Sequence, residues 1–413
     1  MTTLVKPFAA LRPDAEHAAA VVAPPYDVVS TMEARELVAG HPNSFLHISR
    51  PEIDLPLNTD PYSDDVYARG AANLKRLTAL GLLTRDSTPS YYVYRMRMGK
   101  HEQTGVALTA SVAAYDANRV RKHERTRPDK EADRARNMVS LNAQTGPVLS
   151  VYRANATIKA LLDQIKNETS ILDVTGQYNV AHTLWQVDQP AIVDTLSNVF
   201  NAMDAIYIAD GHHRSAAASR VAAERAATNS AAQPANADFF LTVVFPHDEV
   251  NILDYNRIVK DMNSLSPQEL LEHLSKAFDI KTEDGSVRPD KPGSFGMYVD
   301  GQWFHLTIHP ELIPERDPVG RLDVSLLQDQ LLAPILGVGD PRLDPRIEFV
   351  GGIRGLDALQ QSVDAGNAAI AFALYPTSME QLMAVADAEQ LMPPKSTWFE
   401  PKLADGLLTH VLD

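Results

Sequence analysis

The strongest chemical pattern in the chain is Asp210-Gly211-His212-His213-Arg214, which stands between the apolar run AIYIAD and the alanine-rich run SAAASRVAAERAA. An apolar run, a glycine and an alanine-rich run in this order predict a strand, a tight turn and a helix. The free N–H groups at the start of such a helix favour an anion, and Arg214 can hold a phosphate with two parallel hydrogen bonds. The pattern therefore predicts an anion-binding turn. The residues expected at the phosphate are Gly211, His212, His213 and Arg214.

Asp210 admits several roles in this turn. Its carboxylate could cap the helix, orient a catalytic His213, or hold a Mg²⁺ ion beside a phosphate. A simpler interpretation has Asp210 as the helix cap, Arg214 as its ion-pair partner and the two histidines as surface turn residues. A metal held by both histidines is disfavoured, because adjacent residues on a helix point about 100° apart.

A very polar stretch, RKHERTRPDKEADRAR, covers residues 121–136. One interpretation is a segment that covers the phosphate during transfer, with Arg127 and Lys130 neutralising charge. In that interpretation His123 or Glu124 is the general base, and Glu124 is the first choice. The alternative is a solvated helix with ion pairs along its surface, since acidic and basic residues recur at helical spacing.

The segment MPPKSTWFEPKL, near the C-terminus, is a second basic candidate. Its two prolines would hold a loop rigidly, and Lys395, Ser396 and Thr397 could then form a second clamp for a phosphate or a carboxylate. Lys402 is expected to contact the substrate. The alternative is a loop that is held in place by its aromatic residues.

The segment APPYDVV, near the N-terminus, is made rigid by two adjacent prolines. Tyr26 and Asp27 follow them and are expected to line the substrate pocket. The alternative is a turn that ends a strand.

Composition restricts the possible functions. The chain has 413 residues and a formal net charge of −15, which disfavours nucleic acid as a partner. It has no cysteine, so disulfides, thiolate metal sites and cysteine nucleophiles are excluded. No apolar run is long enough to span a bilayer. We therefore expect a cytoplasmic protein, which could form a homo-oligomer. The common nucleotide, zinc-protease and serine-hydrolase motifs GxxxxGK[ST], GxGxxG, HExxH and GxSxG are absent.

Alternating strand-like and helix-like runs predict an α/β fold of mixed α+β character. Residues 64–81 are expected to form an amphipathic helix, and residues 91–98 a half-buried strand. The run SFLHI, residues 44–48, is expected to be a strand. Residues 1–248 are expected to contain the phosphate-binding core, and residues 249–413 to form a C-terminal α+β region that completes the site.

The segment IADGHHR, followed by an alanine-rich helix, resembles the phosphate-binding motif of the ParB/sulfiredoxin-like superfamily, which includes free-serine kinases. The whole chain also resembles a bacterial and archaeal domain-of-unknown-function family, number 1015. The shared segments are APPYDVVS, FLHISRPEIDLP, HERTRPDKEADR, HTLW, YIADGHHR, ILDYNRIV, FVGGIRG and MPPKSTWFEPKL. The resemblance implies a ParB/sulfiredoxin-like nucleotide-binding core elaborated by extra mixed-sheet segments. It places Asp210, His212, His213 and Arg214 at nucleotide phosphates.

These patterns lead to the hypothesis of a kinase that uses ATP or ADP with Mg²⁺ and acts on a small hydroxylated metabolite, with serine as the model. Two alternatives remain open. One is a phosphohydrolase or nucleotidase that uses the same pocket. The other is a regulator that binds a nucleotide or metabolite without catalysis.

Overall fold

The computed structural model describes residues 3–228 and 236–413 and divides the chain into two compact units. Unit 1 comprises the residues up to Val250 together with Pro401–Asp413, and unit 2 comprises Asn251–Glu400. The segment Pro401–Asp413 lies in unit 1 because its strand β21 (Thr409–Val411) pairs with β2 (Ala10–Arg12) and β7 (Ala143–Gln144). Both units combine helices with sheets, which confirms the expected mixed α/β fold class.

Unit 1 is built on a mixed sheet in which the described residues contribute nine strands. Across the sheet, the order is β6 (Val120–Arg121), β11 (Ile206–Asp210), β8 (Val148–Tyr152), β12 (Phe239–Pro246), β5 (His101–Ser111), β4 (Tyr91–Met98), β10 (Ala181–Val187) and β9 (Leu172–Thr175), and β1 (Val5–Lys6) also pairs with β5. Strand β8 runs antiparallel to β11 and parallel to β12. A smaller sheet joins β3 (Thr84–Arg85), β2, β21 and β7.

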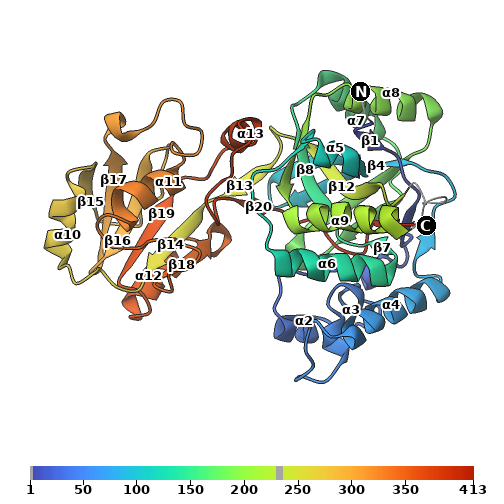
Figure 1. Ribbon diagram of the computed structural model, residues 1–413, viewed down its shortest axis with the longest axis horizontal. Helices are drawn as coiled ribbons and strands as arrows, with labels where there is room; N and C mark the ends of the chain where they lie inside the picture. Colours follow the sequence, from blue (N-terminus) through green and yellow to red (C-terminus); the bar gives the residue numbers. More distant parts are fainter. Residues whose placement is uncertain (1–2, 229–235) are drawn as a thin grey trace. The chain divides into compact units, whose positions relative to one another are not determined.

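The helices of unit 1 pack on its sheets or on one another and bury apolar side chains in two core clusters. They are α1 (Ala18–Val21), α2 (Thr31–Leu37), α3 (Leu46–Ser49), α4 (Asp64–Ala79), α5 (Val112–Asp116), α6 (Pro128–Leu141), α7 (Ala156–Ile165), α8 (Pro190–Asn201) and α9 (His212–Thr228), with 3₁₀ turns η1 (Pro51–Asp54) and η2 (Gln177–Asn179). Helix α9 buries Ala217, Ala218 and Val221, whose small side chains permit close packing on the sheet. Figure 1 shows α6 running beside α9, so the polar stretch and the Asp210–Arg214 turn share one side of unit 1.

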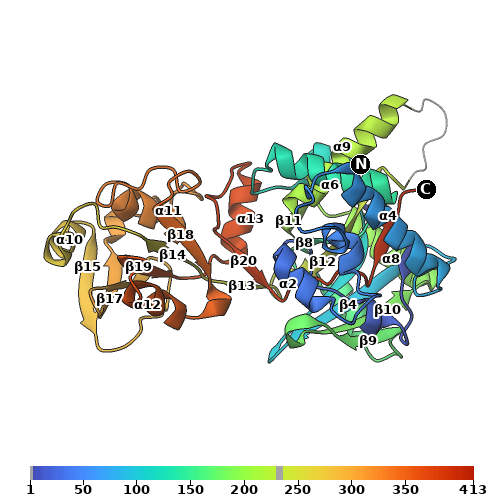
Figure 2. The same ribbon diagram turned by 90° about the horizontal axis from the view of Figure 1, so that it is seen from below.

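Unit 2 contains a six-stranded antiparallel sheet and its own apolar core. The strand order is β15 (Phe278–Glu283), β17 (Gln302–Ile308), β16 (Ser294–Val299), β19 (Ile370–Leu374), β14 (Tyr255–Val259) and β18 (Ile347–Gly351), and β13 (Asn251–Leu253) pairs with β20 (Trp398–Glu400). Its helices are α10 (Pro267–Leu274), α11 (Asp323–Leu327), α12 (Asp357–Asp364) and α13 (Met379–Asp387), with short turns η3 (Pro310–Leu312), η4 (Gln328–Leu332) and η5 (Gly352–Arg354). Helix α12 packs on β16 and β19 (Figure 2).

Two local expectations are wrong. The run SFLHI is not a strand, because Leu46–Ser49 forms helix α3 and packs against α4. A short apolar run has no periodicity that separates a buried strand from a buried helical turn. Strand β4 is more deeply buried than its alternation suggests: Tyr91–Tyr94 are all buried, because Tyr91 and Val93 face the main core and Tyr92 on the other face packs against Phe8. The expected helix over residues 64–81 is confirmed as α4.

The part of the chain that the structure describes contains no helix that is both long and apolar enough to cross a membrane.

Candidate functional site

The Asp210–Arg214 segment forms the strand, turn and helix that its sequence predicts. Strand β11 is buried along most of its length and shifts register against β8 between Ile208 and Asp210. Such an irregularity re-aims the side chains at the end of a strand. Gly211 follows with a φ of +103°, and its carbonyl accepts hydrogen bonds from Arg214 N and Ser215 N at 2.9 and 3.1 Å. The turn therefore places the N-terminus of helix α9 at the C-terminal end of strand β11.

Gly211 is required here for space as well as for backbone conformation. A Cβ atom at this position would lie 3.1 Å from both Cζ and Nε of Arg214. The guanidinium of Arg214 thus folds back over the turn that precedes it. This close approach explains why the residue between Asp210 and His212 is a glycine.

Arg214 is buried among acidic groups at the centre of the site. Its Nη1 donates to Pro147 O, and its Nη2 lies 3.9 Å from a carboxylate oxygen of Asp27 and 3.9 Å from one of Asp210. Its Nε is buried and has no hydrogen-bond partner among the described residues. Burial alone would lower the pKa of Arg214, but the nearby carboxylates raise it, so the side chain is a fixed cation.

Asp210 is held by a lysine from the far end of the sequence. Nζ of Lys402 donates to Oδ2 of Asp210 at 3.0 Å. Burial would raise the pKa of Asp210, but Lys402 and Arg214 together hold it well below its usual range. Lys402 therefore reaches the predicted site, where it pairs with Asp210, a partner that the sequence did not indicate.

Asp210 is a poor fit for a Mg²⁺ ligand, because two cationic side chains already compensate its charge.

The two histidines of the motif face different surroundings, as expected for adjacent helical residues. His212 is buried against His123, with ring centroids 4.4 Å apart and planes at 87°. Nε2 of His212 accepts a long hydrogen bond from His123 N at 3.4 Å, and its Nδ1 lies 3.7 Å from Oε2 of Glu124. Burial lowers the pKa of His123 to about 4 and that of His212 well below its usual value, so both rings are neutral at pH 7.

His123, Glu124 and His212 form a group that could offer metal ligands. One ligand atom from each lies within 4.8 Å of the others, and Nδ1 of His123 is buried without a hydrogen-bond partner among the described residues. Because Nε2 of His212 accepts from His123 N, the proton of that neutral ring is on Nδ1, which faces Glu124. Hydrogen bonding thus accounts for the orientation of His212 without an ion, and we assign no metal to the group.

His213 is half-buried on the other side of the turn. Its Nε2 accepts a hydrogen bond from Arg127 N at 3.1 Å, which leaves the proton of the neutral ring on Nδ1. Burial lowers the pKa of His213, while Asp27 opposes that shift. His213 is consequently a neutral hydrogen-bond donor beside the start of α9.

The polar stretch is half loop and half helix. Residues 122–127 form the loop, and Pro128 is the first residue of α6. The second half of the stretch is therefore helical, as in the alternative interpretation of a solvated helix with ion pairs. Arg127 pairs with Asp129 at 2.8 Å, and both side chains are exposed. Nζ of Lys130 donates to the hydroxyl of Tyr62 at 2.8 Å. The structure thus brings His123, Glu124 and Arg127 to the turn, and Lys130 follows on the exposed face of α6.

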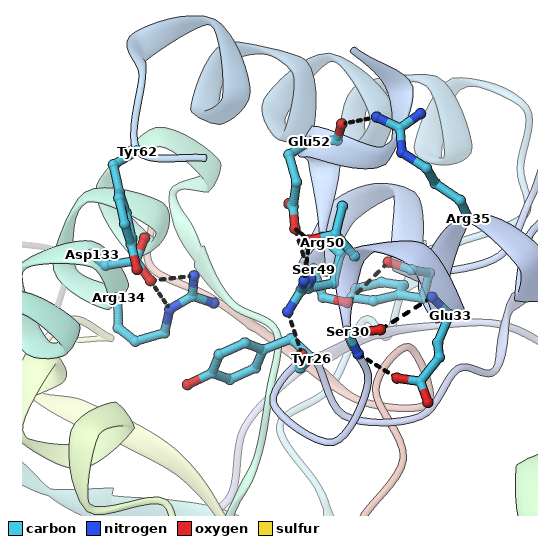
Figure 3. Close-up of polar contacts among 12 residues, drawn as sticks. Tyr26, Ser30, Glu33, Arg35, Ser49, Arg50, Glu52, Tyr62, Asp133 and Arg134 are labelled. Atoms are coloured by element: carbon cyan, nitrogen blue, oxygen red, sulfur yellow. Dashed lines mark hydrogen bonds and ion pairs between the residues drawn. The ribbon is translucent and has the colours of Figure 1, made fainter. Parts of the chain in front are cut away.

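The proline-rich loop carries Tyr26 and brings Asp27 to 3.9 Å from Arg214, while a role of these two residues in binding substrate stays a prediction. Arg50 donates to the carbonyl of Tyr26 at 3.1 Å and forms an ion pair with Glu52 (Figure 3). The guanidinium of Arg134 lies 4.1 Å above the Tyr26 ring and is itself held by Asp133 at 2.7 Å. The pKa of Tyr26 is raised to about 12, mainly by burial, so the phenol keeps its proton.

Asp405 belongs to this site although sequence reasoning missed it. Its backbone exchanges hydrogen bonds with Ala23 at 2.9 and 3.1 Å, which places it beside the Tyr26–Asp27 loop. The residue is 1% exposed, and neither carboxyl oxygen has a hydrogen bond of acceptable geometry among the described residues. Burial raises its pKa to about 7, and Arg214 opposes that shift. The one sequence signal is an acidic residue inside the apolar run LADGLL.

Lys395, Ser396 and Thr397 lie in unit 2, whereas the residues described above lie in unit 1. The hydroxyl of Ser396 donates to Pro393 O at 2.6 Å, and the residue is 6% exposed. Its carbonyl accepts a hydrogen bond from the hydroxyl of Thr377. Ser396 therefore stabilises its own loop, and Lys395 is the exposed cation of that loop.

Known proteins resemble this chain only distantly. No curated protein matches the sequence of the chain. A free serine kinase in complex with AMP aligns with a TM-score of 0.35 and 13% identity, over 74% of this chain and 89% of the kinase chain. SbnI with a C-terminal truncation, from Staphylococcus aureus, aligns with a TM-score of 0.34 and 11% identity, over 72% of this chain and 85% of its own. A conserved hypothetical protein from Pyrococcus furiosus has a TM-score of 0.34 and 14% identity, over 75% and 96%.

These TM-scores and identities are too low to carry a function from those proteins to this one. The family comparison is more specific, because it matches the segment that contains the loop of Tyr26 and Asp27, the polar stretch and the Asp210–Arg214 turn. The model of the family DUF1015, described as a protein of unknown function, matches residues 5–325, and this chain therefore belongs to the DUF1015 family.

Proposed function

We propose that unit 1 is a nucleotide-dependent phosphotransferase that binds the phosphates of ATP or ADP at the turn between β11 and α9. The acceptor in this proposal is a small hydroxylated metabolite, and serine is the first compound to test. The observation that carries the proposal is the buried guanidinium of Arg214, folded over Gly211 with an unpartnered Nε at the start of a helix. A fixed cation at a helix N-terminus is a suitable site for phosphate.

Three kinds of donor converge on the proposed phosphate. Because Gly211 O accepts from Arg214 N and Ser215 N, the N–H groups of His212 and His213 are the ones at the start of α9 that have no acceptor within the helix. Nδ1–H of His213 and Nε–H of Arg214 add directed hydrogen bonds. Arg127, whose backbone N–H binds Nε2 of His213, and Lys130, in the first turn of α6, would neutralise the charge of a polyphosphate. The turn thus supplies positive potential without a Mg²⁺ ion at Asp210, and no step of the proposal uses one.

Glu124 is the proposed proton acceptor. Its side chain is 51% exposed and stands beside His212, which limits its orientation. In the transfer step, the acceptor hydroxyl oxygen forms a bond to the terminal phosphorus as the bond from that phosphorus to the nucleotide oxygen breaks. The hydroxyl proton passes to Glu124, and the charge on the departing nucleotide is stabilised by Arg214 and His213.

The buried carboxyl group of Asp405 supports Arg214 in this proposal. Its pKa of about 7 means that it is partly protonated at neutral pH, which limits the negative charge around the guanidinium. Asp27 and Asp210 already stand 3.9 Å from Arg214. A third full carboxylate charge would compete with an incoming phosphate for the same cation.

Phosphorus NMR of the purified protein with ATP or ADP, with and without a pool of hydroxyl metabolites, tests the proposal. A new phosphoester signal that needs the pool and forms more slowly in His213→Ala supports a kinase. Inorganic phosphate without an acceptor would instead identify a hydrolase. Nucleotide binding without turnover would identify a regulator, and absence of nucleotide binding would contradict the site itself.

A further inference from the structure

Unit 2 contains a cavity of about 250 Å³. It is bordered by β14, β18, the end of α11 with the π-helical turn η4, and the Pro393-Pro394 segment. Figure 1 shows β14, β18 and α11 within unit 2. Most of its wall is apolar, with Val324, Leu332 and Ile347 among the lining residues. The polar groups that open into it are therefore few, and each needs a physical explanation.

Arg257, from the middle of β14, is the cation of this cavity. The residue is 3% exposed and lines the cavity wall. Its guanidinium donates to the carbonyls of Tyr255 and Lys395 and lies 5.2 Å from the centre of the Phe349 ring. No carboxylate forms an ion pair with Arg257 in the part of the chain that the structure describes. A buried charge without a counter-charge is unfavourable, and such groups are normally paired.

The charge of Arg257 persists in spite of its burial. Burial lowers the pKa of its guanidinium to about 10, which still leaves the group protonated at neutral pH. The two carbonyl acceptors offset part of the desolvation, but they carry no net charge. An anion that enters from the cavity would supply the missing counter-charge.

Two further residues that line the same cavity carry a polar atom without a hydrogen-bond partner among the described residues. The Ser325 residue is 6% exposed, and its Oγ is buried with no hydrogen-bond partner among the described residues. Oε1 of Gln328 is also buried and unpartnered, while its amide nitrogen donates to Val338 O and Gly339 O. Cation, hydroxyl and amide oxygen are thus fixed around one apolar space, as in a small-molecule site.

We propose that this cavity binds a small carboxylate with an apolar body, whose carboxylate pairs with Arg257 and accepts a hydrogen bond from Ser325. A monoanion fits better than a phosphate, because the exposed Asp329 also lines the cavity and repels a second negative charge. The sequence predicted a phosphate or carboxylate clamp at Lys395–Thr397. In this proposal the cation is Arg257, and Lys395 contributes only its carbonyl.

Isovalerate and its neutral amide, isovaleramide, are matched probes for the proposed site. Their binding to the full-length protein is followed by calorimetry or saturation-transfer NMR, with inorganic phosphate as a competitor. Isovalerate is expected to bind at least about tenfold more tightly than isovaleramide, a difference of about 1.4 kcal/mol. Phosphate is expected not to displace it. Equal binding of both probes, no binding of isovalerate, or displacement by phosphate at equal concentration would each overturn the proposal.

Variants of unit 2 locate the binding. Arg257→Met and Arg257→Lys, which lacks the planar fork, should each weaken isovalerate binding about tenfold or more. Ser325→Ala should weaken it about two- to tenfold and removes too little volume to endanger folding. Arg354→Met removes an exposed arginine of the same unit and should leave binding unchanged. Wild-type affinity in a folded Arg257→Met or in Ser325→Ala would contradict the assignment. Arg257, Ser325 and Arg354 all lie in unit 2, so the comparison of these variants is independent of the proposed phosphotransferase.

Discussion

The ammonium group of Lys402 lies 3.0 Å from Oδ2 of Asp210, although 192 residues separate them in the sequence. The contact is partly shielded from water, with 21% of the lysine side chain and 32% of the aspartate side chain exposed. It ties the C-terminal segment of unit 1 to the end of β11, directly before the proposed phosphate site. The pair therefore links the stability of the C-terminal segment to the geometry of the turn.

Lys402→Met should lower the free energy of unfolding by about 1–3 kcal/mol, because it leaves a shielded carboxylate without its nearest counter-charge. Urea denaturation measures the change. Adding Asp210→Asn should recover part of the loss, since the unpaired charge is then gone. Lys159→Met is the matched control: it removes an ion pair to Asp163 in which the side chains are 69% and 49% exposed, and should have little effect. Equal losses from Lys402→Met and Lys159→Met would show that the shielded pair stabilises the protein no more than an exposed one.

Asp405 should make stability depend on pH in the range between its unfolded and folded pKa values. Burial raises that pKa from 3.8 to about 7, so the folded state holds the proton more tightly than the unfolded chain. The resulting stabilisation is complete below pH 4 and is lost as pH rises toward 7. Asp405→Asn should therefore be more stable than the wild type at pH 8, by roughly 2–4 kcal/mol, with a smaller difference at pH 5.

Urea unfolding at pH 5 and pH 8 measures this effect. Asp64→Asn controls for the simple removal of one negative charge, because its side chain is 98% exposed. A difference between Asp405→Asn and the wild type that does not change with pH would mean that Asp405 titrates normally.

The local part of the site could be predicted from sequence because its signals are contiguous. An apolar strand, a glycine and an alanine-rich helix stand next to each other, and the predicted turn forms at Gly211. The separation of His212 and His213 onto different sides also followed from helical geometry alone. Residues 64–81 were predictable for the same reason, since a long amphipathic pattern has one consistent period.

The long-range part could not be predicted. Asp405 meets the Tyr26 loop through a backbone pairing with Ala23, and nothing in either segment identifies the other as its partner. Arg257 was also missed, because a single arginine in the strand-like run ILDYNRIV looks like the solvent-facing residue of a half-buried strand. Its burial depends on which elements cover β14. The prediction of a strand at SFLHI was wrong for a different reason: the run is too short for its periodicity to distinguish a helix from a strand.

Gly211→Ala should test whether the turn needs glycine for its backbone angle alone or also for the guanidinium above it. Gly40→Ala is a matched control, because Gly40 has a φ of +80° and nothing within 4 Å of an added Cβ. Both changes force alanine into a left-handed conformation, at a cost of about 1–2 kcal/mol. Gly211→Ala should cost about 1 kcal/mol more, because its Cβ meets Arg214 at 3.1 Å.

Thermal or urea unfolding measures both substitutions, and nucleotide titration supplies a second readout. Gly211→Ala should also weaken nucleotide binding, since Arg214 must move, whereas Gly40→Ala should not. If the two variants lose the same stability and bind alike, the guanidinium is not held over the turn in solution.

Glu124 and His213 flank the turn with different proposed tasks, and single substitutions should separate them. Glu124→Gln keeps the size of the side chain but cannot take a proton, so phosphoester formation should fall by about 10²–10⁴-fold. Nucleotide affinity should stay within about threefold, because the glutamate is not among the phosphate donors.

His213→Ala removes a hydrogen bond to a charged group, which contributes about 1.5–3 kcal/mol, so nucleotide binding should weaken about tenfold or more. Calorimetry gives the affinities and phosphorus NMR the rates, with Glu131→Gln on α6 as the control for a lost carboxylate. A Glu124→Gln protein with full turnover would remove Glu124 from the reaction while leaving the phosphate site to be judged by His213→Ala.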